Sequence, residues 1–152
     1  MQIGEQKLYH FLETKLAKIY PISTSLRPPS CLENSLGTPT GLHEIADKIG
    51  VGEPEGMVFE GRKPIGIIWQ EMAVERNARN LITTRIMRLR GLEPGHNAGP
   101  GRDSYDRYIY LHGTNYPEKI GTPVSAGCVL LSDANIIELS DRVPEGSFVW
   151  IE

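Results

Sequence analysis

The chain has 152 residues, of which 39% are apolar and 23% are charged, and its formal net charge is −3. This length suits one domain with its own core, so we expect residues 1–152 to form a single domain. Lysine and arginine are scattered, which argues against binding to nucleic acid or an anionic membrane. No apolar run reaches the roughly 20 residues of a membrane span, so we expect no membrane insertion.

The N-terminal ten residues lack the basic and apolar segments of a signal peptide. We therefore expect a cytoplasmic protein, or a periplasmic one if an export signal has been removed. A disulfide between Cys31 and Cys128 is conceivable, but nothing else resembles a secreted, disulfide-stapled domain. Cys31 lies in a loop rich in proline and serine, and we expect no catalytic role for it. Without clustered cysteines and histidines, we expect no metal and no cofactor.

The first third of the chain predicts strands and a long loop. Residues 7–22 hold two apolar runs broken by residues 13–15, the pattern of a β-hairpin, and Pro21 indicates that the second strand is an edge strand or ends there. Residues 23–41 are rich in proline, glycine and serine and predict a loop, and loops of this length are often functional. Residues 42–49 fit either a helix or a strand, and the glycines and prolines around them favour a strand.

The middle of the chain is divided by glycines and prolines. Short apolar pieces occupy residues 57–59 and 67–69. Residues 71–79 predict a short helix or turn, and the β-branched content of residues 81–89 predicts a strand. Residues 91–102 predict an irregular loop, because they contain many glycines and prolines.

The last third predicts two strands and a helix. Residues 108–111 predict a strand that ends at His112, which we therefore expect near a loop mouth rather than deep in the core. Ser132 or Asp133 can cap a helix over about residues 133–143. A final strand is predicted over residues 148–151. Together the elements predict a mainly β, sandwich-like domain of two mixed sheets with one helix in the C-terminal half.

His112 and Cys128 could together catalyse acyl transfer. A cysteine attacks as its thiolate, and a neighbouring histidine lowers the thiol pKa by forming an imidazolium–thiolate pair. Gly113 would let the chain turn so that a local carbonyl orients the imidazole ring. Gly127 would help the N–H groups of Gly127 and Cys128 to form an oxyanion hole, and Ser125 could orient or donate.

The same residues also have a structural interpretation. A cysteine in an apolar run is usually a small buried hydrophobic residue, and a lone histidine is usually structural. The spacing of His112 and Cys128 alone leaves the catalytic and structural interpretations about equally supported.

Longer motifs favour catalysis. The chain reads His-Gly-Thr-Asn at residues 112–115 and Gly-Thr-Pro-Val-Ser-Ala-Gly-Cys-Val at residues 121–129. With Thr-Pro-Thr-Gly at 38–41, Arg-Leu-Arg-Gly-Leu-Glu-Pro-Gly at 88–95 and the run at 103–113, these motifs closely resemble the catalytic domain of the L,D-transpeptidase (YkuD-like) family. The resemblance covers essentially the whole chain. It implies a β-rich fold without a metal, acting on peptidoglycan stem peptides or soluble muropeptides.

The resemblance also implies a reaction. Cys128 would attack the carbonyl of the third stem residue, the terminal D-alanine would leave, and an acyl-enzyme would form. His112 matches the family's base, and Gly113 matches the position whose carbonyl steadies it. The acyl group would then pass to water, or to the amine of another stem to make a 3–3 cross-link.

Two positions depart from the family pattern. Ala126 stands where the family often has histidine, and Leu130 where it often has arginine. The nucleophile and the base are kept, but a cation that could hold a substrate carboxylate is lost. Arg88, Arg102 or Arg107 could replace it. The residues that we expect to bind substrate are Tyr110, Asn115, Ala126, Leu130, Arg102 and Arg107.

Three functions follow. The first is an L,D-carboxypeptidase that trims muropeptides during wall recycling, favoured by the absence of an export signal and of a wall-binding module. The second is an L,D-transpeptidase that forms cross-links outside the membrane. The third is a catalytically silent binder of stem peptides. In each case we expect a monomer.

Overall fold

The fold begins with a β-hairpin. A computed structural model of the chain describes residues 1–73, 75 and 78–152. Strands β1 (Lys7–Leu12) and β2 (Lys15–Pro21) form a two-stranded antiparallel sheet. The hairpin predicted over residues 7–22 is confirmed, as is the end of its second strand at Pro21.

The other strands form a seven-stranded sheet. They are β3 (Gly41–Ile49), β4 (Met57–Glu60), β5 (Lys63–Ile68), β6 (Ile82–Gly91), β7 (Tyr110–Gly113), β8 (Val129–Leu131) and β9 (Phe148–Ile151). Strand β6 lies at the centre and pairs antiparallel with β3, β4 and β7. Strand β7 also pairs with β8, and these two strands run parallel. The strands predicted over 42–49, 81–89 and 148–151 are therefore confirmed, with ends shifted by at most a few residues.

The predicted C-terminal helix is also confirmed, as α2 (Asp133–Arg142). Its N-cap is Ser132, whose hydroxyl accepts the backbone N–H of Asn135, so an orphan donor of the first turn is satisfied. Two single-turn 3-10 helices, η1 (Trp69–Glu71) and η2 (Pro117–Lys119), lie in connections. The helix or turn predicted over residues 71–79 includes residues 74, 76 and 77, which lie outside the described residues.

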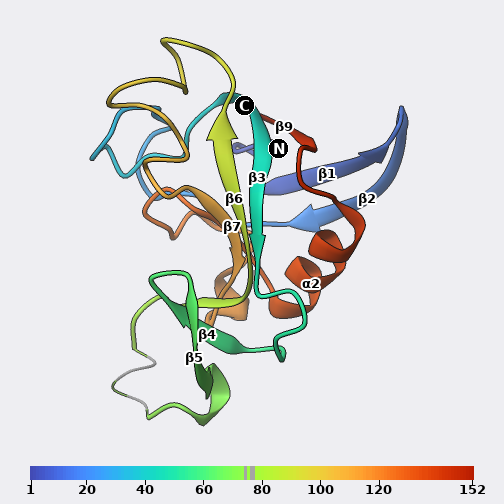
Figure 1. Cartoon of the computed structure of the whole chain (residues 1–152), viewed down its shortest axis with the longest axis vertical. Helices are drawn as coiled ribbons and strands as arrows, with labels where there is room; N and C mark the ends of the chain where they lie inside the picture. The colour runs from blue at the N-terminus through green and yellow to red at the C-terminus, as the bar shows by residue number, and fades with distance from the viewer. Residues whose placement is uncertain (74, 76–77) are drawn as a thin grey trace.

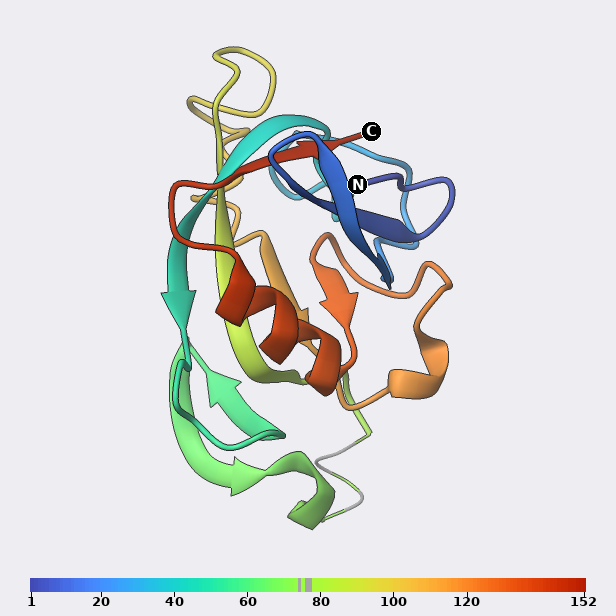
Figure 2. The same ribbon diagram turned by 90° about the vertical axis from the view of Figure 1, so that its right-hand side faces the viewer.

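The large sheet separates two apolar clusters. Figure 2 shows α2 and the β1–β2 hairpin lying over one face of the sheet, where the main core includes Tyr20, Leu111, Val129 and Ile136. The long loops of residues 22–40 and 92–109 lie on the other side of the sheet in Figure 1. A second cluster packs Phe59 and neighbouring apolar residues against Ile86 and Tyr110. Within the described residues, no helix is long and apolar enough to cross a membrane.

Strand β7 begins later than predicted. Tyr108 has a left-handed φ of 56°, which breaks the extended conformation, so the strand starts at Tyr110 and includes both His112 and Gly113. His112 is only 3% exposed, so the prediction of a position near a loop mouth was wrong. The strand carries the histidine into the sheet rather than ending in front of it.

A buried carboxylate ties α2 to β6. Asp133 accepts hydrogen bonds from Thr83 Oγ1 (2.6 Å), from the Thr84 hydroxyl and from Trp69 Nε1 (2.8 Å). Adjacent residues of a regular strand face opposite sides, but a bulge in β6 with φ 67° at Thr84 lets both hydroxyls reach one carboxylate. These three hydrogen bonds fix the start of α2 beside the end of β7.

Replacing Asp133 with alanine should therefore destabilise the fold. Asp133→Ala leaves two buried hydroxyls and an indole N–H without their acceptor, and we expect the free energy of unfolding to fall by about 3 kcal/mol. Asp141→Ala, at an exposed position of the same helix, is the matched control and should change it by less than about 0.5 kcal/mol. Urea unfolding measures both. Equal effects of the two substitutions would contradict the assignment.

Candidate active site

The parallel pairing of β7 with β8 brings His112 and Cys128 to one face of the sheet. His112 pairs with Leu130, and Leu111 pairs with Val129, so Cys128 comes one position before the ladder and opposite Tyr110. Because alternate residues share a face, His112, Leu130, Tyr110 and Cys128 lie on the side away from α2. Within the described part of the chain, the Cys128 thiol and the His112 ring are not hydrogen-bonded to each other.

The surroundings of His112 fix its tautomer. Its Nδ1 lies 2.7 Å from the carbonyl oxygen of Gly113. A carbonyl can only accept, so Nδ1 carries the ring proton, and Nε2 of the neutral ring is left as a base. Burial lowers the pKa of His112 to about 4, although the Gly113 carbonyl and the Asp133 carboxylate act in the opposite direction. His112 is therefore a neutral base at physiological pH.

Gly113 is required for space rather than for a turn. Its φ is not left-handed, so the expected sharp turn is absent. A Cβ at this position would lie 2.6 Å from Thr83 Oγ1 and 2.7 Å from the Thr83 carbonyl oxygen, and would also meet Asp133. Glycine lets β7 approach β6 and the start of α2 closely enough to aim its carbonyl at His112.

Cys128 lies against the backbone of β7. Its Sγ is 3.5 Å from the Tyr108 carbonyl oxygen, which accepts the thiol proton. Burial raises the pKa of Cys128 to about 11, while the Tyr110 N–H and the charge of Arg107 act in the opposite direction. Part of the residue remains accessible to solvent. The expected imidazolium–thiolate pair is thus absent, because burial keeps both Cys128 and His112 neutral.

The turn before Cys128 is held by Ser125. The Ser125 hydroxyl donates to the Cys128 carbonyl oxygen (2.6 Å) and accepts from the Gly127 N–H (3.2 Å). Gly127 has φ 124°, a conformation that side chains disfavour. The Gly127 N–H is engaged, whereas none of the described residues accepts from the Cys128 N–H, so this group is a free donor in the turn. Ser125 therefore orients the turn from inside.

A hollow lies at Ala126, two residues before Cys128. Ala126 is exposed and lines a cavity of about 290 Å³ together with Arg107, Tyr108 and Ile109. Residues of the loop before β3 close the other side, namely Glu33, Asn34 and Leu36. The small side chain of Ala126 therefore leaves room at the turn that precedes the nucleophile.

Two other predicted substrate residues are buried and engaged. Leu130 is 1% exposed. The Asn115 side chain accepts from the Leu81 N–H (2.8 Å) and donates to the Arg79 carbonyl (3.1 Å), so it positions the entry to β6. Tyr110 is buried as well, but its hydroxyl accepts from Arg62 Nη1 at 3.3 Å. Sequence reasoning missed Arg62, which lies in the β4–β5 turn, far from any motif.

The three arginines considered as replacements for the motif cation differ in their surroundings. Arg102 donates to the Gly95 carbonyl within its own loop. Arg88 stacks on the Tyr105 ring (3.4 Å to the centroid) and donates to the Tyr105 carbonyl. Arg107 alone of the three acts on the thiol of Cys128.

Arg107 holds the loop before β3 in place. Its guanidinium donates to the carbonyl oxygens of Ser30 (3.0 Å) and Gly37 (2.8 Å) and to the Ser35 hydroxyl (3.3 Å). These bonds direct its donors at the protein. Arg107 therefore places a positive charge at the hollow, and its hydrogen bonds hold the loop that forms part of the lining.

A second thiol lies close to a second imidazole. Cys31 Sγ is 3.6 Å from His96 Nε2, which is itself 3.1 Å from the Thr40 hydroxyl. Both cysteines are free thiols. This contact joins the two long loops, and sequence reasoning did not find it because the residues are far apart in the chain. No glycine-cysteine turn with a free N–H accompanies Cys31 in the described structure.

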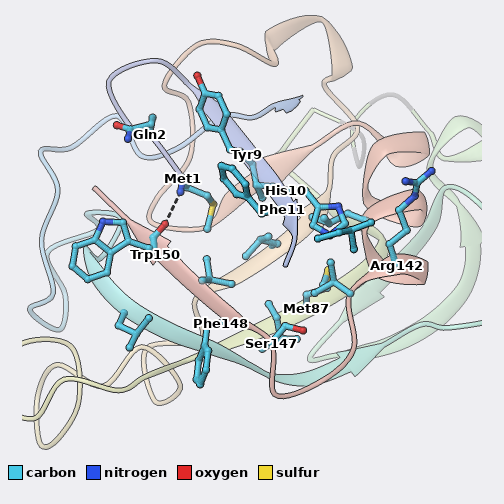
Figure 3. Close-up of a pocket in the computed structure, with 18 of the residues that line it drawn as sticks. Met1, Gln2, Tyr9, His10, Phe11, Met87, Arg142, Ser147, Phe148 and Trp150 are labelled. Atoms are coloured by element: carbon cyan, nitrogen blue, oxygen red, sulfur yellow. Dashed lines mark hydrogen bonds between the residues drawn. The ribbon is translucent and has the colours of Figure 1, made fainter. Parts of the chain in front are cut away.

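A larger cavity of about 820 Å³ lies on the opposite face, between the β1–β2 hairpin, β9 and the end of α2. Figure 3 shows its wall, with Tyr9, Phe11, Phe148 and Trp150 around it. Neither His112 nor Cys128 is among the described residues that line it. The described residues also contain no group of three or more His, Cys, Asp or Glu side chains that could hold a metal ion.

Comparison with known proteins identifies the family of the chain. The family model of the L,D-transpeptidase catalytic domain (YkuD) matches residues 2–151. YkuD of Bacillus subtilis (strain 168) is 46% identical over 41 residues, which are 27% of this chain and 25% of that protein. YkuD of Bacillus licheniformis is 44% identical over a segment of the same length.

Solved structures share the fold. An L,D-transpeptidase from Mycobacterium smegmatis superposes with a TM-score of 0.57 at 17% identity, over 99% of this chain and 56% of that chain. The catalytic domain of an Enterococcus faecium L,D-transpeptidase acylated by ertapenem superposes with a TM-score of 0.55 at 14% identity. The match covers 100% of this chain and 93% of that chain. The chain thus spans about half the length of the M. smegmatis protein. With the family model matching nearly every residue, the chain belongs to the L,D-transpeptidase catalytic domain family.

Proposed function

We propose that this chain is a cysteine acyl-transfer enzyme acting on peptidoglycan stem peptides, and that water is its main acceptor, which makes it an L,D-carboxypeptidase. The observation that carries the proposal is the placement of a neutral base, His112, and a thiol, Cys128, on one face of adjoining parallel strands. The free N–H of Cys128 beside the thiol supplies the third element of acyl transfer.

The first step follows from the protonation states. Because both groups start neutral, His112 Nε2 removes the thiol proton as Sγ attacks the carbonyl of the third stem residue. The Cys128 N–H donates to the oxygen that becomes negative. The imidazolium that forms is stabilised by the Gly113 carbonyl and by Asp133, the two groups that favour the charged ring.

The second step releases the leaving residue. His112 returns the proton to the amine of the terminal D-alanine, the C–N bond breaks, and the acyl group stays on Cys128 as a thioester. Water then attacks the thioester with Nε2 again taking a proton, the C–S bond breaks, and the imidazolium returns that proton to the Cys128 sulfur as the tripeptide acid leaves. A site that keeps part of Cys128 accessible to solvent admits this water.

The size of the hollow favours water over an amine acceptor. A volume of about 290 Å³ is at the lower end of the roughly 300–1,000 Å³ of ligand pockets. This hollow at Ala126, in the turn that leads to Cys128, fits one residue-sized group better than two stem peptides at once. Hydrolysis of soluble muropeptides in wall recycling, in the cytoplasm, is the role that we propose for such a site.

An L,D-transpeptidase that makes 3–3 cross-links is the second candidate. It shares every step up to the acyl-enzyme and differs only in the acceptor. A silent binder is the third candidate, and the structure of an Enterococcus faecium relative acylated by ertapenem suggests its test. Acylation of Cys128 by a carbapenem would contradict the hypothesis of a catalytically silent binder.

Product masses separate the first two candidates. Incubation of the protein with a disaccharide-tetrapeptide should yield disaccharide-tripeptide and free alanine in a reaction that Cys128→Ala abolishes. His112→Ala should retain less than about 1% of the activity, since general-base catalysis contributes about 10²–10⁴-fold. Cross-linked dimers in excess over tripeptide would contradict the carboxypeptidase. Wild-type rates in His112→Ala would contradict the assignment of the base.

The pH profile should be unusual for a cysteine–histidine enzyme. With the His112 pKa near 4 and the Cys128 pKa near 11, kcat/KM should stay level from about pH 5 to about pH 10 and fall only toward pH 4. Protonation of buried His112 favours the unfolded chain, so the contribution of His112 to stability is full above pH ~6.5 and declines toward pH 4. Unfolding must therefore be followed in parallel. An acid limb at pH ~6.5 in folded protein would contradict this protonation state.

Gly113→Ala should disable the base without removing it. The new Cβ would press on the Thr83 carbonyl and displace the strand that aims His112, and displacements near 1 Å can cost about a hundredfold in rate. We expect kcat to fall by about that factor with KM little changed. Gly4→Ala, where a Cβ meets nothing within 4 Å, is the control and should behave as wild type. An active Gly113→Ala enzyme would show that the close approach is dispensable.

A further inference from the structure

The β4–β5 hairpin carries an arginine to the neighbourhood of Cys128. Glu60 pairs with Lys63 across a two-residue turn made of Gly61 and Arg62. Both turn residues have left-handed φ angles, 55° and 67°. Glycine adopts this conformation without cost, but a residue with a long side chain does so at the expense of stability. A strained arginine at a turn that could hold glycine points to a use for its guanidinium.

The guanidinium of Arg62 rests on two tyrosines next to the nucleophile. Its Nη1 donates to the Tyr110 hydroxyl at 3.3 Å, and its centre lies 5.0 Å from the Tyr108 ring centroid. The same two tyrosines contact Cys128 through their backbones, since the Tyr108 carbonyl accepts from Sγ and the Tyr110 N–H faces it. The positive charge therefore lies on the catalytic face of the sheet.

Arg62 has no carboxylate partner among residues 1–73, 75 and 78–152. No carboxylate of this part of the chain forms an ion pair with it, and the one hydrogen bond found there goes to the Tyr110 hydroxyl. A guanidinium has five N–H donors, so most of its capacity is open. Arg107, by contrast, directs its donors at three acceptors of the loop before β3. Arg62 is thus a cation of this face that is available to a ligand.

We propose that Arg62 binds a carboxylate of the substrate, namely the terminal carboxylate of the residue that leaves, and so supplies the cation that Leu130 does not. This inference rests on the proposed function for the identity of the substrate. A guanidinium pairs with a carboxylate through two parallel hydrogen bonds, which would fix the peptide's end while Cys128 attacks one residue earlier. The Tyr110 hydroxyl and the Tyr108 ring preorganise the guanidinium for this contact.

Binding to an inactive protein tests the proposal independently of turnover. In the Cys128→Ala background, calorimetry compares a disaccharide-tetrapeptide that ends in a free carboxylate with the same peptide ending in an amide. We expect the acid to bind about tenfold to a hundredfold more tightly than the amide, a range typical of a charge-assisted pair. Adding Arg62→Gly should abolish this difference by weakening the acid alone. The glycine suits the left-handed turn, so the hairpin is not weakened.

Two further variants sharpen the result. Arg62→Lys keeps the positive charge but loses the paired N–H donors of the guanidinium, and we expect an intermediate preference for the acid. Lys63→Gln, on the same turn and exposed, is the control and should keep the full preference. Three results overturn the proposal. The Cys128→Ala protein could bind acid and amide equally, it could bind neither, or its preference for the acid could survive the addition of Arg62→Gly. Arg62-dependent binding without turnover by the native protein overturns the proposed function instead.

Discussion

The parallel pairing of β7 with β8 is the constraint on which the candidate active site depends. It sets His112 against Leu130 and so brings Cys128, one step before the ladder, to the face that holds the imidazole. A shift of one residue would turn Cys128 toward the main core under α2 and leave the base without a thiol. The turn held by Ser125 and the close approach at Gly113 keep this register in place.

Burial gives the pair its chemical character. The same apolar surroundings that stabilise the sheet penalise charge on both groups, so the resting site holds a thiol and a neutral imidazole rather than an ion pair. Proton transfer then accompanies attack. Charge therefore develops only during the reaction with substrate. Asp133 and the Gly113 carbonyl stabilise the positive charge on the His112 ring, and the Cys128 N–H stabilises the negative charge on the substrate oxygen. The site is therefore prepared for the transition state rather than for the resting enzyme.

Local patterns in the sequence predicted the hairpin, the main strands and the capped helix, because each depends on neighbouring residues. The prediction of His112 and Cys128 as base and nucleophile needed the resemblance to a family, because their spacing alone supported a structural role equally well. Contacts between distant segments escaped prediction. Asp133 looked like an ordinary helix start, yet it gathers Thr83, Thr84 and Trp69. Arg62 belonged to no motif, and the Cys31–His96 contact joins two loops of irregular sequence. Burial of His112 was missed because the left-handed Tyr108 moves the start of β7.

The central claim is that Cys128, and not the equally free Cys31, is the nucleophile. Intact-mass spectrometry after incubation with ertapenem tests it directly, in the native protein and in the Cys128→Ala and Cys31→Ala variants. The account predicts a single adduct on the native protein and on Cys31→Ala, and none on Cys128→Ala. An adduct that persists in Cys128→Ala and disappears in Cys31→Ala would place the chemistry at the Cys31–His96 contact and contradict the account.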